Sequence, residues 1–209
     1  MAHQGGARLV VDPRAVGDNR GMAGSSAGRT HTVTINRAPV LTLWAAVVAE
    51  RLGYDRDEAV TLGRAVAGLN AAAKARSLGI ARPREKPAVE KPARAPKAGE
   101  LLEVSLCNRI VPAVRTPDGL RATSDGKPTA PASVHRYLES KFGEALDDVR
   151  EAMAALARSL AKDELAASAF NLYEAFRPGI PAGVRGWGAK GVLDLSRIRA
   201  LAAKGRASR

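Results

Sequence analysis

The chain has 209 residues, a single cysteine and a formal net charge of +12, with an isoelectric point near 10.5. One cysteine excludes an intramolecular disulfide and favours a reducing compartment, so we expect a cytoplasmic protein. No apolar run is long enough for a transmembrane helix, so we expect no membrane association. The net positive charge favours a polyanionic partner, and nucleic acid is the leading candidate. A competing explanation is an arginine-rich coding background, because 24 Arg accompany only 9 Lys.

The N-terminal part begins with a segment that lacks periodicity. Residues 1–29 are rich in Gly, Arg and Ser, lack the apolar centre of a signal peptide, and are expected to be a disordered leader. Met22 is an alternative start. Residues 30–36 alternate β-branched and polar side chains, which predicts a short strand.

Two helices follow as a hairpin. The apolar spacing of residues 39–52 predicts the first helix, closed by Gly53. The second is capped by Asp55 or Asp57 and runs to about Ser77. Small residues recur along it at every fourth position and form a ridge that lets another helix approach closely. The ridge residues are Ala59, Gly63, Ala67, Ala71 and Ala75. We expect the hairpin to dock through this surface, either in a homodimer or on the C-terminal part.

Residues 81–100 change composition sharply. Four prolines separate six basic residues, which blocks helix formation and favours extended backbone. We interpret this segment as a semi-rigid basic linker and as the domain boundary.

The C-terminal part is expected to begin with strands and continue with helices. Residues 101–128 read as short strands of a β-hairpin or meander, in which Pro112 should place its strand at an edge. A helix over 131–142 precedes amphipathic helices that end before Pro178, and a Gly/Pro loop covers 177–192. Asp194 should cap a last helix.

These elements predict an α+β protein that is predominantly α-helical. The expected organisation is a leader (1–29), a strand with a helical hairpin (30–80), the linker (81–100), and a β-hairpin followed by helices and a basic tail (101–209). We identify no family resemblance, and no cofactor or metal site is expected.

Basic residues concentrate in three segments that we expect to contact phosphates. Residues 177–209 carry eight basic residues and one acidic residue, whereas 144–176 carry three basic and seven acidic ones. The candidates are Arg82, Arg84, Lys86, Lys91, Arg94 and Lys97 in the linker, Arg185 and Lys190 in the Gly-rich loop, and Arg197, Arg199, Lys204 and Arg206 in the tail. Such contacts give affinity with little sequence preference. The expected function is therefore that of a nucleoid-associated or regulatory nucleic-acid-binding protein, and DNA and RNA stay open.

Several other interpretations compete with this one. A helical protein–protein interaction module would use the small-residue ridge. A helix-turn-helix over residues 41–72 would place Asp57 and Glu58 against an anionic duplex, which is unfavourable. The pattern G-x-G-x-x-G at 186–191 follows a loop instead of a strand, so a dinucleotide site is not expected. No catalytic motif is present, and Cys107 reads as a small buried residue, so we expect no enzyme.

Overall fold

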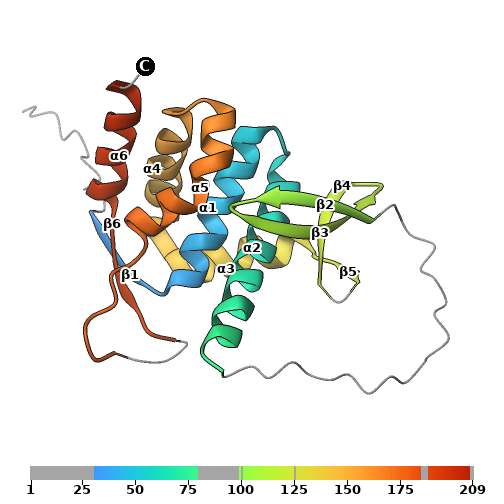
Figure 1. The fold of residues 1–209 in the computed structure, drawn as a ribbon, viewed down its shortest axis with the longest axis horizontal. Helices are drawn as coiled ribbons and strands as arrows, with labels where there is room; N and C mark the ends of the chain where they lie inside the picture. Colours follow the sequence, from blue (N-terminus) through green and yellow to red (C-terminus); the bar gives the residue numbers. More distant parts are fainter. Residues whose placement is uncertain (1–30, 80–98, 100, 125, 185–187, 208–209) are drawn as a thin grey trace, which may run out of the picture.

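The computed structural model describes residues 31–79, 99, 101–124, 126–184 and 188–207. It is a predominantly helical α+β structure with small antiparallel sheets, as the sequence predicts. Helices form the centre of the molecule; a sheet lies on one side and a last helix with a two-stranded sheet lies on the other (Figure 1). The expected leader (1–29) and almost all of the basic linker (81–100) lie outside the described residues.

Strand β1 (Thr32–Ile35) leads into the hairpin of α1 (Arg37–Leu52) and α2 (Arg56–Ser77). Gly53 ends α1 with φ +119°, a conformation that favours glycine, and its N–H donates to the carbonyls of Ala49 and Glu50. At α2, Asp55 accepts from Glu58 N while the Glu58 side chain accepts from Asp55 N, which forms a capping box. The predicted helices and both of their predicted boundary signals are therefore confirmed.

The main sheet is an antiparallel meander. It contains β2 (Leu101–Leu106), β3 (Arg109–Thr116), β4 (Gly119–Ser124) and β5 (Lys127–Pro128), in that spatial order. The prediction that Pro112 would force an edge was wrong, because β3 lies between β2 and β4. The β3–β4 register covers only residues 113–116 of β3, so Pro112 pairs with Glu103 of β2, and on the β4 side its carbonyl accepts from the Thr123 hydroxyl at 3.3 Å.

Helices complete the fold. Their bounds are α3 (Pro131–Phe142), a 3₁₀ turn η1 (Gly143–Ala145), α4 (Leu146–Arg158), α5 (Lys162–Phe176) and α6 (Leu195–Ala207). Asp194 caps α6 by accepting from Ser196 N at 2.8 Å, as predicted. Strand β6 (Gly191–Asp194), which begins at the end of the expected Gly/Pro loop, was not predicted; it pairs antiparallel with β1.

A single hydrophobic core joins the two halves of the chain. It contains buried residues of α1 and α2 together with residues of β2, β3, β4 and helices α3 to α6. Trp44 of α1 donates from Nε1 to the carbonyl of Ala169 on α5 at 2.7 Å, and its ring packs edge-on against Phe176 at 5.3 Å. The expected linker boundary thus does not separate two cores, because the apolar side chains of the α1–α2 hairpin pack against the C-terminal helices. None of the helices among the described residues combines the length and apolar character needed to cross a bilayer.

Candidate functional site

A pocket of about 590 Å³ opens between segments that are far apart in sequence. Its walls come from the start of α1, the C-terminal half of α2, the start of β3, the end of α5 and the loop after α5. Its volume lies within the range of about 300–1,000 Å³ that is typical of small-molecule sites. It is therefore the candidate functional site of the described residues.

The lengths of the two hairpin helices explain why this space stays open. Helix α2 has 22 residues and α1 has 16, so the C-terminal end of α2 extends past the beginning of α1 (Figure 1). The α2 residues that line the pocket include Ala67, Ala71 and Ala73, whose methyl groups fill little volume. Small side chains beside an overhanging helix leave a hollow with an apolar floor.

The rim of the pocket is strongly cationic. It carries Arg37, Lys74, Arg109 and Arg177 against one carboxylate, that of Glu174. Arg177 pairs with Glu174 at 2.7 Å. Among the described residues, the other three cations form no ion pair. The pocket therefore has an excess of positive charge that an anion would balance.

Two of these arginines are held in place by neutral groups. Arg37 Nε donates to the carbonyl of Pro178 at 3.2 Å. Arg109 Nη2 donates to Asn70 Oδ1 at 2.9 Å, and its guanidinium lies 5.7 Å from the ring centroid of Phe170. Neutral acceptors fix a guanidinium without cancelling its charge. Both cations are thus positioned in advance for a negatively charged partner.

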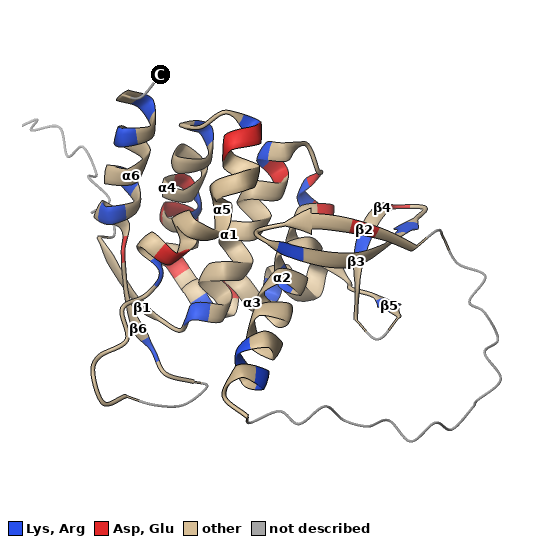
Figure 2. Ribbon diagram, in the orientation of Figure 1, with Lys and Arg blue, Asp and Glu red and all other residues tan. Residues whose placement is uncertain are grey.

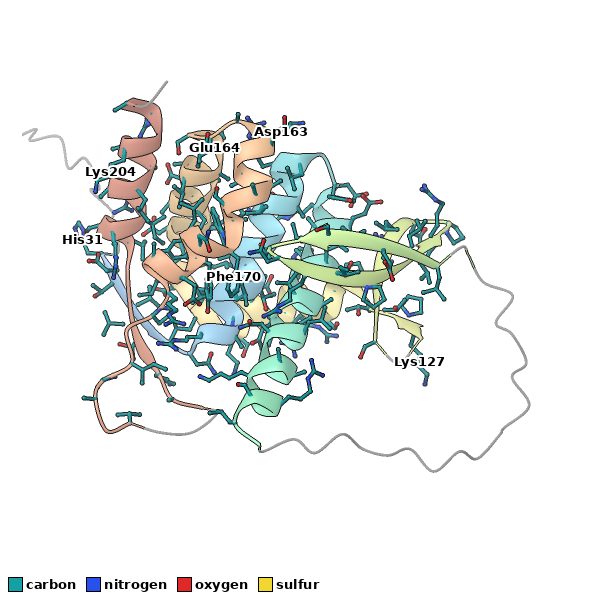
Figure 3. The ribbon with its side chains drawn as sticks, in the orientation of Figure 1. His31, Lys127, Asp163, Glu164, Phe170 and Lys204 are labelled. Carbon is teal, nitrogen blue, oxygen red and sulfur yellow. The ribbon has the colours of Figure 1, made fainter. Side chains whose placement is uncertain are left out.

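Arg109 also carries an unused donor. Its Nε is buried and has no hydrogen-bond partner among the described residues. A buried donor without a partner costs about 1–3 kcal/mol, and because this atom is closed to solvent it does not itself face the open pocket. Figure 3 places Phe170 on α5 beside the tip of the β2–β3 hairpin, which brings Arg109 to the pocket.

Tyr173 forms a buried wall of the pocket. Burial raises the pKa of its hydroxyl to about 12, an effect that Arg37 and Arg177 partly oppose and Glu174 adds to. The phenol therefore stays protonated at neutral pH, and it donates to the carbonyl of Arg37 at 3.3 Å. This tyrosine is suited to shaping the pocket and not to removing a proton from a ligand.

The basic residues expected from the sequence are only partly connected to this site. The six linker residues Arg82, Arg84, Lys86, Lys91, Arg94 and Lys97 lie outside the described residues, as does Arg185. Lys190 is exposed and follows Ala189, which lines the pocket.

The tail cations occupy a separate surface. The pocket lining includes none of the α6 residues Arg197, Arg199, Lys204 and Arg206. Figure 2 shows the basic segments of α6 on the far side of the helices from those at the end of α2, and Figure 3 labels Lys204 there. Arg199 instead borders a small hollow of about 70 Å³ together with Glu151. Within the part of the chain that the structure describes, the pocket cations and the α6 cations therefore form two separate basic regions.

The small-residue ridge is used within the chain. Ala59, Gly63 and Ala67 are buried, and a Cβ added at Gly63 would lie 2.8 Å from Ala46 N of α1. A partner helix cannot reach this part of the ridge while α1 covers it. Ala71 is half-buried and lines the pocket instead. The surface on which the interaction-module and homodimer hypotheses depended is thus largely occupied.

The structure also bears on the helix-turn-helix hypothesis and on the basic residues of the meander. At the start of α2, Glu58 accepts from Leu120 N of β4 at 2.7 Å, so a strand covers the end that a recognition helix would present to bases. Arg121 of the meander is only 7% exposed, and it donates to the carbonyls of Leu120 and Asp118 at 3.0 and 2.7 Å. Its charge is therefore not on the strand surface.

Sequence reasoning missed the residues that this pocket brings together. Arg37, Lys74 and Arg177 each lie in an unremarkable helical or loop context, and Arg109 falls within the predicted strands of 101–128. No local spacing links them, because the residues come from separate elements. The one sequence signal for this site was the small-residue ridge, of which Ala67 and Ala71 line the pocket.

Comparison with known proteins gave no match to a family model, a curated protein or a solved structure. The pocket itself is therefore the basis for assigning a function.

Proposed function

We propose that this is a cytoplasmic nucleic-acid-binding protein that holds phosphate groups mainly by charge, with the cationic pocket as its anchor. The observation that carries the proposal is the set of three cations, Arg37, Lys74 and Arg109, that have no ion-pair partner among the described residues. Phosphates are the abundant polyanionic groups that such a rim suits. The cytoplasmic location is inferred from Cys107, which is free and buried.

The chain that leaves the pocket at the end of α2 continues into a basic segment. Ser77 and Leu78 line it at the end of α2, and the segment with six basic residues begins a few residues later. These cations are therefore tethered to the rim by the covalent chain. Charge supplied in this way increases affinity without reading bases, which favours weakly sequence-specific binding.

The test is binding to a labelled DNA duplex over a salt series, with Lys74→Gln as the variant. Lys74 is exposed, so removing its charge should not disturb the fold. Each lost phosphate contact should reduce the log–log salt slope by about 0.9 and weaken binding at low salt. Lys141→Gln is the matched control, because Lys141 is also an exposed helical lysine but lies outside the pocket lining.

Two results would overturn the proposal. One is the absence of binding by the unmodified chain at low salt, which would make the net charge a compositional background. The other is an equal salt slope for the Lys74 and Lys141 variants, which would remove the pocket from the interface. A separate variant with all six basic residues of 81–100 changed to Gln measures what the linker adds.

A further inference from the structure

We infer that the pocket binds one nucleotide unit, with its phosphate among Arg37, Lys74 and Arg109 and its base or sugar on the apolar floor. This inference rests on the proposed function and specifies it. The ligand chemistry is a phosphate ester attached to a flat group. It is available either from an unpaired nucleotide of a single strand or from a free nucleotide.

The shape of the site favours an unpaired nucleotide over a duplex. Phosphates of a duplex lie on a convex surface, and its bases are stacked inside. A hollow of about 590 Å³ is reached only by a group that leaves the stack or was never in one. A duplex would then bind through the charges of the pocket rim and the linker. The interior of the pocket would bind a single unpaired nucleotide.

The floor offers apolar contact of the kind that a base needs. Ala38, Leu41 and Ala71 line it, and Leu78 lies at its edge with 58% of its surface exposed. A large apolar side chain exposed at a pocket rim is more informative than one that is isolated on a surface. The Arg109 guanidinium, whose central carbon lies 5.7 Å from the Phe170 ring centroid, adds a planar group against which a base can pack.

The polar groups of the site match the two ends of a nucleotide. Asn70 Oδ1 accepts from Arg109, which leaves the Asn70 amide N–H groups as donors for a base or sugar oxygen. For the phosphate, Arg109 supplies a guanidinium charge that no carboxylate among the described residues balances. Arg37 and Ala38 begin α1, whose Asn36 cap position makes no side-chain capping bond, so first-turn N–H groups add positive potential there.

The experiment separates the pocket interior from the rim by filling it without changing charge. Ala71→Leu places a larger side chain into the pocket at a helical position that tolerates leucine. Ala72→Leu is the matched control, because Ala72 is exposed on the same helix and is not part of the lining. The probes are a fluorescent single-stranded oligothymidylate, adenosine monophosphate and the labelled duplex.

We expect Ala71→Leu to weaken binding of the single strand by about tenfold or more, as loss of one base-stacking site does, while its duplex salt slope stays unchanged. Ala72→Leu should bind like the unmodified chain. Competition by adenosine monophosphate identifies a free nucleotide as a sufficient ligand, and its absence identifies a nucleotide within a strand. Asn70→Asp, which is isosteric and sets a carboxylate beside Arg109, should weaken the same probes even if Ala71→Leu misfolds.

The inference is overturned if both variants bind the single strand and the nucleotide as Ala72→Leu does, or if the unmodified chain binds neither. Duplex binding with a steep salt slope would in that case leave the proposed function standing without a nucleotide pocket. If the unmodified chain instead binds the nucleotide but shows no salt-dependent duplex binding, the nucleotide pocket stands and the proposed function fails.

Discussion

Gly63 is the position at which a single methyl group should disturb the fold most clearly. An ideal Cβ at this residue would lie 2.8 Å from Ala46 N and 3.2 Å from Ala46 Cβ, and it would meet the carbonyl oxygen of Thr42 more closely still. Two of these three contacts are with backbone, which cannot rotate away as a flexible side chain can. Gly63→Ala therefore requires α1 and α2 to move apart along an interface that is fully buried at Ala59, Leu62 and Val66.

Two opposing effects set the size of the change. Replacing glycine by alanine inside a helix gains about 1 kcal/mol in helix propensity. Overpacking a well-packed interface costs about 1–3 kcal/mol, and rigid backbone neighbours place this site at the upper end. We expect a net loss of about 1–2 kcal/mol of unfolding free energy for Gly63→Ala.

Gly68 provides the matched control within the same helix. It is exposed, and a Cβ there would meet nothing within 4 Å, so Gly68→Ala should gain about 1 kcal/mol. Urea unfolding followed by circular dichroism should separate the two variants by about 2–3 kcal/mol, or roughly 5–10 °C in Tm. Equal stabilities would show that α1 does not lie against Gly63 as described, and the account of the ridge would fail.

Two further predictions concern buried groups. Trp44→Phe removes the buried hydrogen bond to the carbonyl of Ala169, so we expect a loss of about 1–3 kcal/mol in urea unfolding; an unchanged midpoint would contradict this. Burial raises the pKa of the Cys107 thiol from 9.0 to about 12, so between these values the unfolded chain loses a proton that the folded chain keeps. Stability should therefore fall with rising pH by up to about 1.4 kcal/mol per unit from this group, and Cys107→Ala should flatten unfolding free energies measured from about pH 9 to 10. Parallel pH profiles for the two proteins would refute that assignment.

The sequence predicted the elements whose signals act over three or four residues. Gly53 and the Asp55–Glu58 capping box mark helix ends through hydrogen bonds to their own neighbours, and Asp194 does the same for α6. Strand β6 carries no comparable local signal. It is a strand because β1, about 160 residues earlier in the chain, pairs with it, with Leu193 opposite Val33.

What the sequence determined by itself is therefore the helical character, the boundaries of most helices and the positive charge, because periodicity, capping and composition are local properties. Only the tertiary structure decided which basic side chains are buried and which line a common pocket. Arg121 is buried and donates to backbone carbonyls, whereas Arg37 and Arg109 both line the pocket. Both outcomes depend on contacts between elements that are far apart in the chain, and local sequence patterns do not specify such contacts.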